Sequence, residues 1–244
     1  MALHETAGSG LACYAGHQIA DHPVRKATEQ ACQLGARVEE DEPNSTRQQP
    51  SGAGADVYFS ADVETDGPIP GLYSMLSFAL VVAGRFDGQR FTAPERYDVS
   101  FFRELRPISS EFEPEALAIN RLDRDRLRRE GSDPTEVMTA AAEWVRQQAG
   151  QATPVLVAYP VSFDWTWLYW YFTRFSRTGS PFNHSRCFDL KTAFAVKGRR
   201  PIGLAGRDEL PPELRAHQLH THQALDDAIE QAEIFAKVFA WKGA

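Results

Sequence analysis

The chain has few cysteines, no excess of positive charge and no long hydrophobic run. Its three cysteines, among 244 residues, have spacings that fit neither a disulfide framework nor a zinc-binding motif, so we expect a reducing compartment. A formal net charge of -7 argues against a protein that holds nucleic acid through a broad basic surface. No stretch approaches ~18 apolar residues, and the N-terminus lacks the plan of a secretory signal. A cytoplasmic protein without membrane contact is predicted.

What the chain does contain divides it into two parts. Residues 1–54 are acidic and then rich in Pro, Ser, Gly and Gln, a composition that cannot bury a core. Residues 55–244 carry regular apolar patterns, and their length is sufficient for one large core. We therefore expect a flexible leader or linker over 1–54 and a single folded domain over 55–244.

Strands open the folded part. Residues 57–64 (VYFSADVE) are rich in β-branched and aromatic side chains, and residues 71–84, after a Gly- and Pro-rich turn, are apolar almost throughout. These two runs predict a hairpin. Residues 96–107 alternate in polarity until Pro107, which predicts a third antiparallel strand.

Helices follow the three strands. Residues 113–122 and 123–131 form two short helical stretches, and a longer helix has Asp133 as its N-cap, Pro134 at its first position and Gly150 after its end. All of these features favour a mixed α/β protein.

The rest of the chain alternates strand and helix. Residues 154–161 are a short apolar strand, and an aromatic helix begins near Ser162, which together form an α/β unit. Another short element begins at 187–198, residues 199–218 are expected to be loop, and 221–242 form a terminal amphipathic helix. A mixed sheet is predicted, with three antiparallel strands and then parallel strands, flanked by helices.

Four acids stand at the ends of these elements. Asp62 and Glu64 lie two residues apart on the first strand, so their side chains share a face and repel each other. Asp164 lies at a strand-helix junction, and Asp227 lies early in the last helix. Hard divalent cations prefer carboxylate oxygens, and a pair of them needs several acids from separate elements. Bound Mg²⁺ or Mn²⁺ would offset the repulsion.

Three of the four acids also have a simpler interpretation. An Asp-x-Glu sequence is expected by chance about once in a chain of this length, given roughly 6% of each acid. Asp62 and Glu64 are then solvated acids at a strand end, and Asp164 is an acid favoured by the helix macrodipole. The His-x₄-Asp spacing occurs twice, at His184 with Asp189 and at His222 with Asp227.

Several other polar and aromatic residues are interpreted as structural. His184, Asp189, His217 and His220 are interpreted as structural or solvated, with His217 and His220 as loop residues near the site. The aromatic run at 165–172 is more typical of a core or a partner surface than of a platform for stacked bases.

Three segments of the chain resemble, in the same order, the motifs of a known family. ADVETDG on the first strand, VAYPVSFDWTWL at the strand-helix junction and THQALDDA at the last helix resemble the three motifs of the DEDDh, or DnaQ-like, 3′–5′ exonucleases. The resemblance covers about residues 56–240. It implies the α/β fold of the ribonuclease H-like superfamily.

The resemblance also implies a site. It makes four acids the ligands of two Mg²⁺ or Mn²⁺ ions, with a histidine as the general base: Asp62, Glu64, Asp164, Asp227 and His222. Asp226 competes with Asp227, because it too is acidic and lies four residues after His222. The apolar stripe of the helix does not separate them, since both lie off its apolar face. Only the register His-x-Ala-Leu-x-Asp-Ala favours Asp227.

The residues expected at the substrate are less conventional. Thr65 follows the acid pair and is expected to contact the end nucleotide, and Phe163 is expected to stack on a base. Asn120 stands where the family often has a histidine in a substrate-side turn. Tyr159 and Pro160 replace a polar pair, and Pro160 offers no N–H donor.

These implications predict a metal-dependent exonuclease that acts on the 3′ ends of single-stranded DNA or RNA. The alternative is a catalytically silent nucleic-acid-binding or scaffold domain of the same fold. A third function is that of a phosphodiesterase for internal bonds or small nucleotides. The choice between DNA and RNA stays open. The oligomeric state also stays open, and a homodimer formed through exposed aromatic side chains is one alternative.

Overall fold

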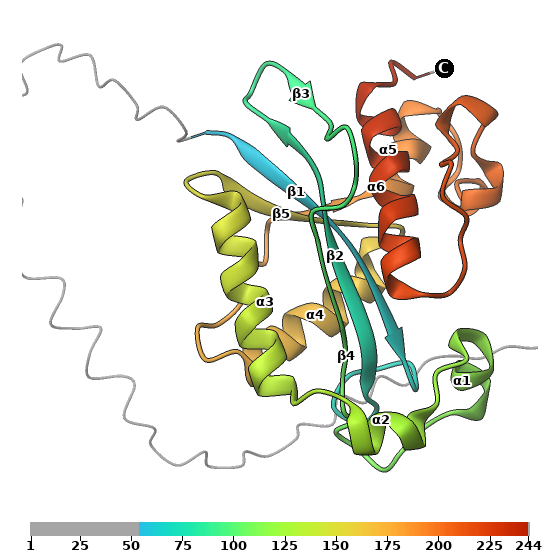
Figure 1. The fold of residues 1–244 in the computed structure, drawn as a ribbon. Coiled ribbons are helices and arrows are strands. Elements are labelled where there is room, and N and C mark those ends of the chain that lie inside the picture. The colour runs from blue at the N-terminus through green and yellow to red at the C-terminus, as the bar shows by residue number, and fades with distance from the viewer. Residues whose placement is uncertain (1–53, 244) are drawn as a thin grey trace, which may run out of the picture. The chain divides into compact units, whose positions relative to one another are not determined.

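The computed structural model describes residues 54–243, in which six strands form one mixed sheet (Figure 1). The strands are β1 (Asp56–Thr65), β2 (Met75–Phe86), β3 (Phe91–Thr92), β4 (Ser100–Glu104), β5 (Thr153–Ala158) and β6 (Cys187–Asp189). Their order is β3-β2-β1-β5-β6, with β4 also paired to β2. The leader predicted at residues 1–54 lies outside the described residues, except for Gly54.

Strand directions agree with the predicted class. β2 pairs antiparallel with β1, β3 and β4, whereas β5 pairs parallel with both β1 and β6. The predicted hairpin and the mixed sheet are therefore confirmed. The sequence prediction missed β3 and made the next strand too long, since pairing along β4 covers only Ser100–Glu104.

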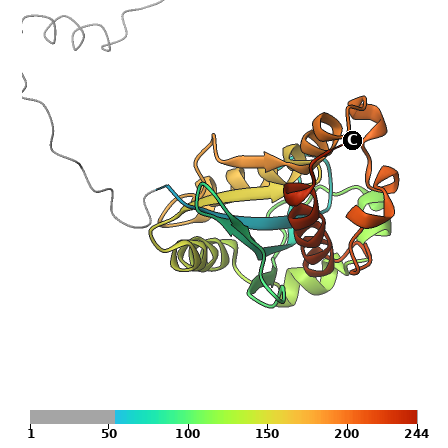
Figure 2. The same cartoon turned by 90° about the horizontal axis from the view of Figure 1, so that it is seen from above.

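Helices cover both faces of the sheet. They are α1 (Pro114–Asn120), α2 (Arg124–Glu130), α3 (Pro134–Ala149), α4 (Val161–Phe175), α5 (Leu190–Lys197) and α6 (Ala224–Ala240). One core packs α3 and α4 against the sheet, and a second core packs α5 and α6 against it. Figures 1 and 2 show α3 and α6 on either side of the strands. As predicted, the Asp133 carboxylate caps α3 by accepting hydrogen bonds from two backbone amides.

The alternation of β1 decides where its acids point. Val57, Phe59, Ala61 and Val63 belong to the core that contains α3 and α4. Side chains two residues apart share a face, so the even-numbered residues of this stretch point to the face that α6 covers. The acid pair, at positions 62 and 64, is thereby placed on that face.

The segment between α5 and α6 differs from the predicted loop. It contains three 3₁₀ turns, at Ile202–Leu204, Arg207–Glu209 and Pro212–Leu214. Pro201 and Pro211 precede the first and last turns, and each carbonyl accepts a hydrogen bond from the amide three residues on. The fixed φ of proline favours such a tight turn, because it suits the start of a helix.

Two further findings concern the described residues. The last helix begins at Ala224 rather than at the predicted Thr221, so His222 precedes the helix. Nowhere in 54–243 is there a helix with the length and apolar character needed to span a bilayer.

Candidate functional site

Three of the four predicted acids form one compact group. Carboxylate oxygens of Asp62, Glu64 and Asp227 all lie within 4.8 Å of one another. Asp62 and Glu64 come from the end of β1, and Asp227 comes from the first turn of α6. Elements far apart in the chain therefore bring these oxygens together.

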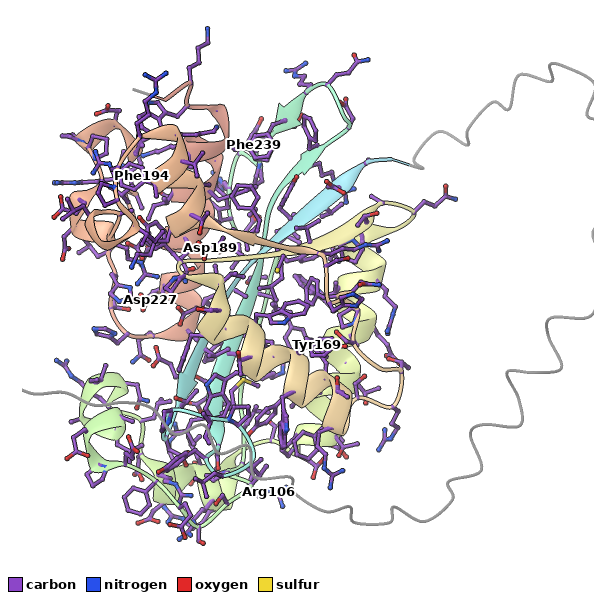
Figure 3. All side chains as sticks on the ribbon, turned by 180° about the vertical axis from the view of Figure 1, so that it is seen from behind. Arg106, Tyr169, Asp189, Phe194, Asp227 and Phe239 are labelled. Carbon is purple, nitrogen blue, oxygen red and sulfur yellow. The ribbon has the colours of Figure 1, made fainter. Side chains whose placement is uncertain are left out.

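Asp164 lies beside this group, in the first turn of α4. Its Oδ1 accepts a hydrogen bond of 3.1 Å from the backbone N–H of Val63, which lies between the two acids of β1. The side chain is buried in the first turn of the helix, where the macrodipole favours a negative charge. Figure 3 shows Asp227 beside the N-terminal end of α4, viewed from behind. Asp164 thus lies next to the acid strand.

The geometry distinguishes Asp227 from Asp226. The carboxylate of Asp227 is buried and accepts hydrogen bonds from the backbone N–H of Thr221 at 2.7 Å and of His222 at 3.0 Å. Asp226 instead accepts a hydrogen bond from the hydroxyl of Thr221 at 2.9 Å. Of the two, only Asp227 has its carboxylate among the acids of β1.

Burial makes three of the acids, Asp62, Glu64 and Asp164, reluctant to ionise. Burial raises the pKa of Asp62 well above its ordinary value, and repulsion by Asp164 and Glu64 raises it further. Burial, followed by repulsion from Asp227 and Asp164, raises the pKa of Glu64 to about 8. Burial also raises the pKa of Asp164 to about 7. Such a site favours a proton or a cation.

The donor set fits a hard divalent cation. All four side chains offer carboxylate oxygens, which Mg²⁺ and Mn²⁺ prefer. Gln231, one helical turn after Asp227 on α6, donates a hydrogen bond from Nε2 to Oδ1 of Asp62 at 2.9 Å. This contact orients one carboxylate of the group. Gln231 was not among the residues predicted from the sequence, although its i,i+4 spacing from Asp227 was a usable signal.

Two histidines lie at the edge of the acid group. His222 has a φ of 57° in the turn before α6, and its ring centroid is 4.5 Å from that of His220. Nδ1 of His220 lies 3.0 Å from Oδ2 of Asp227 and 3.3 Å from Oε2 of Glu230. Burial lowers the pKa of His220. His220 is therefore a loop residue near the acids, as expected.

The other His-x₄-Asp pair lies elsewhere in the chain. Asp189 caps α5 by accepting a hydrogen bond from the N–H of Thr192 at 2.6 Å, and its other oxygen accepts one from Val161 at 2.7 Å. His184 is exposed in the segment before β6. Asp189 therefore holds the start of α4 in place, a structural role consistent with its interpretation from sequence.

Two of the residues expected at the substrate are buried and bonded within the protein. The hydroxyl of Thr65 donates to the carbonyl of Gly67 at 2.8 Å. Asn120 donates from Nδ2 to the carbonyl of Thr65 at 2.9 Å and accepts at Oδ1 from Leu122 at 3.0 Å. Phe163, beside Asp164, is 41% exposed and thus open to a ligand.

The unusual pair before α4 also has a defined place. The Tyr159 hydroxyl donates to the carbonyl of Ala205 at 2.8 Å and so ties the end of β5 to the segment with the 3₁₀ turns. Pro160 stands immediately before the first residue of α4. Here the chain departs from the polar pair that the family resemblance led us to expect.

Comparisons with known proteins agree with this arrangement. A family model described as Exonuclease matches residues 62–235. The chain is also 32% identical over 181 residues to the 3′-5′ DNA exonuclease Cap18 of Escherichia coli, covering 74% of this chain and 90% of that protein. The chain belongs to this exonuclease family. It is a hydrolase of the DEDDh, 3′–5′ type, as the three motifs implied.

Solved structures of exonucleases share the fold. The nuclease domain of 3′hExo, a DEDDh family member bound to rAMP, has a TM-score of 0.57 at 10% identity and matches 78% of this chain and 95% of that domain. Exonuclease I of E. coli with a dT13 oligonucleotide has a TM-score of 0.55 at 18% identity. The match covers 78% of this chain and 41% of exonuclease I, so the chain spans about two fifths of that protein's length.

Proposed function

We propose that this DEDDh exonuclease removes nucleotides one at a time from the 3′ end of single-stranded DNA or RNA. The observation that carries the proposal is the convergence of four buried or partly buried carboxylates from β1, α4 and α6. DNA is the first substrate to test, because the relative at 32% identity is a DNA exonuclease.

The proposed ligands are Asp62, Glu64, Asp164 and Asp227. Two Mg²⁺ or Mn²⁺ ions bound there would acidify a water molecule and stabilise the departing 3′ oxygen. The protein's part is to hold the carboxylates in place before any cation arrives. Backbone N–H groups hold Asp164 and Asp227, and the side-chain amide of Gln231 holds Asp62.

His222 is the proposed general base. Its backbone N–H is bonded to Asp227, which fixes the residue beside one proposed ligand, and its side chain is exposed at the edge of the group. A neutral imidazole there can take the proton of the attacking water. The resulting hydroxide attacks the phosphorus in line with the leaving 3′ oxygen, and the released nucleotide keeps its 5′ phosphate.

Three residues are proposed to help bind the substrate, of which only Phe163 has an exposed side chain. Phe163 presents its ring beside Asp164, so it can stack on the terminal base whatever the sequence. Thr65 and Asn120 are proposed to act mainly through the turn that they hold, with the Thr65 backbone closest to the end nucleotide. Their side-chain bonds keep the end of β1 fixed beside α1.

The test uses matched single strands of DNA and RNA labelled at the 5′ end. With Mg²⁺ or Mn²⁺, the wild type should shorten the DNA to a ladder, and Asp227→Asn should abolish the ladder. Asp226→Asn is the matched control, because it changes the neighbouring acid outside the group and should keep activity within about twofold. An oligonucleotide that is bound but left intact would favour a silent binding domain, and cleavage of a circular strand would favour an endonuclease.

A further inference from the structure

An arginine outside the three motifs lies next to the acid group. Arg207 opens the 3₁₀ turn Arg207–Glu209, in a segment whose position is fixed by its neighbours. The Tyr159 hydroxyl anchors the segment at Ala205, and Arg200 donates to the carbonyls of Leu204 and Glu209 at 3.3 Å. The backbone that carries Arg207 is therefore held from both sides.

The guanidinium of Arg207 points toward the proposed site. Its Nη1 lies 3.1 Å from Nδ1 of His220, and that same ring nitrogen lies 3.0 Å from Oδ2 of Asp227. Its carbon lies 5.7 Å from the centre of the Tyr159 ring, within the range of a cation–π contact. One histidine ring therefore separates the guanidinium of Arg207 from the carboxylate of Asp227.

The contacts of Arg207 leave hydrogen-bonding capacity unused. Nε of Arg207 and Oε2 of Glu230 are both buried, lie 3.5 Å apart and make no hydrogen bond within the described residues. A buried donor held only by this long ion pair is incompletely satisfied, which favours a hydrogen-bond partner that arrives with a ligand. The side chain is 24% exposed, so a ligand can approach it from the solvent.

The negative charge of the substrate phosphodiester favours a cationic side chain at the proposed site. Four ionised carboxylates balance two divalent cations, which leaves the charge of the substrate phosphodiester uncompensated. That charge grows as hydroxide adds to phosphorus. A planar guanidinium with several N–H donors is well suited to bind two phosphate oxygens at once.

We propose that Arg207 is a catalytic residue that binds a non-bridging oxygen of the scissile phosphate. It leaves its long contact with Glu230 for the phosphate when the 3′ end enters the site. This inference rests on the proposed exonuclease function. It also gives a role to Tyr159, which replaces a polar residue of the family motif. The Tyr159 side chain anchors the segment that carries Arg207 and lies beneath the guanidinium.

The test measures phosphate recognition without turnover. In Mg²⁺, calorimetric titration with thymidine 5′-monophosphate should give a Kd at least tenfold weaker for Arg207→Gln than for the wild type. Arg207→Lys should recover part of the loss, since it keeps the charge but not the planar fork. Arg174→Gln is the matched control: it makes the same change in the last turn of α4, at the opposite end from Asp164.

Two further readouts separate binding of the phosphate from a structural role. Removing one transition-state donor costs about 10²–10³ in kcat, so Arg207→Gln should lower kcat by that order while Mn²⁺ affinity stays within about threefold. A variant that changes Mn²⁺ affinity but neither nucleotide binding nor kcat would overturn the proposal. A wild type that leaves labelled single-stranded DNA intact in Mg²⁺ would instead overturn the proposed function on which this inference rests.

Discussion

The backbone nitrogen of Val63 donates a 3.1 Å hydrogen bond to Oδ1 of Asp164, although 101 residues separate the two. Val63 lies between Asp62 and Glu64, so this one bond fixes the start of α4 against the acid pair. The first and second motifs meet through a backbone amide before any cation is bound. A change at Asp164 can therefore remove its charge, its hydrogen bond or both.

Asp164→Asn separates these two effects. The Asn carbonyl oxygen can still accept from Val63, so we expect little loss of stability, while activity should fall by about 10³ or more because a proposed metal ligand has lost its charge. Asp164→Ala leaves the buried amide of Val63 without a partner and should cost a further 1–3 kcal/mol or so. Thermal unfolding in EDTA and the rate on labelled DNA measure both. Equal stability of the two variants would contradict the role of this bond.

Without cations, stability should fall as the pH rises. The folded-state pKa values of Glu64 and Asp164, about 8 and about 7, exceed those of unfolded carboxyl groups, near ~4. Between these limits the folded state holds more protons, so the free energy of unfolding decreases with pH. In EDTA we expect Tm to drop by about 5–10 °C from pH 5 to pH 8.

Saturating Mg²⁺ should remove most of that drop, because bound cations replace the protons. Glu64→Gln should likewise be more stable than the wild type at pH 8 in EDTA, and its Tm should depend less on pH. A Tm in EDTA that rises from pH 5 to pH 8 would show that the acid group is not strained in the absence of metal.

Two neighbouring histidines should differ in their effect on the rate. His222→Ala is expected to lower kcat by about 10²–10⁴, the usual contribution of a general base, with Mn²⁺ affinity retained. His220→Gln should cost less than about tenfold, since His220 contacts Asp227 and Glu230 rather than the attacking water. His184→Ala, in an exposed segment, is the control. A larger loss of kcat in His220→Gln than in His222→Ala would show that His222 is not the general base.

Asn120→Ala should act through stability and KM together. The change removes the donor to the Thr65 carbonyl and the acceptor of the Leu122 amide, both at a buried position. We expect a loss of about 1–3 kcal/mol in the free energy of unfolding, with a higher KM because the end of β1 loosens beside α1. Denaturant unfolding and steady-state kinetics test this. An unchanged stability with a raised KM would indicate that the side chain binds the nucleotide directly.

Part of this site could be predicted because it rests on short-range geometry. The two-residue repeat of a strand places Asp62 and Glu64 on one face, and the structure brings their carboxylates together. The motif register preferred Asp227 over Asp226, but the apolar stripe of the helix could not separate them. Their difference comes from where α6 begins, which leaves backbone amides before the helix free to bind Asp227.

The remainder depends on contacts that no local pattern contains. Arg207 lies in an irregular segment, and its position comes from a bond between Tyr159 and Ala205, which are 46 residues apart. The bonds of Asn120 within the protein likewise depend on how α1 packs beside β1. Spacing along the sequence does not predict such tertiary contacts.

The most direct test of the central claim counts the cations. Calorimetric titration of the wild type with Mn²⁺, in the presence of thymidine 5′-monophosphate, should show two ions per chain. Asp227→Asn should lose at least one of them, and Asp226→Asn should keep both. A wild type that binds no Mn²⁺, or an Asp227→Asn variant with unchanged stoichiometry and affinity, would contradict a metal site built from these carboxylates.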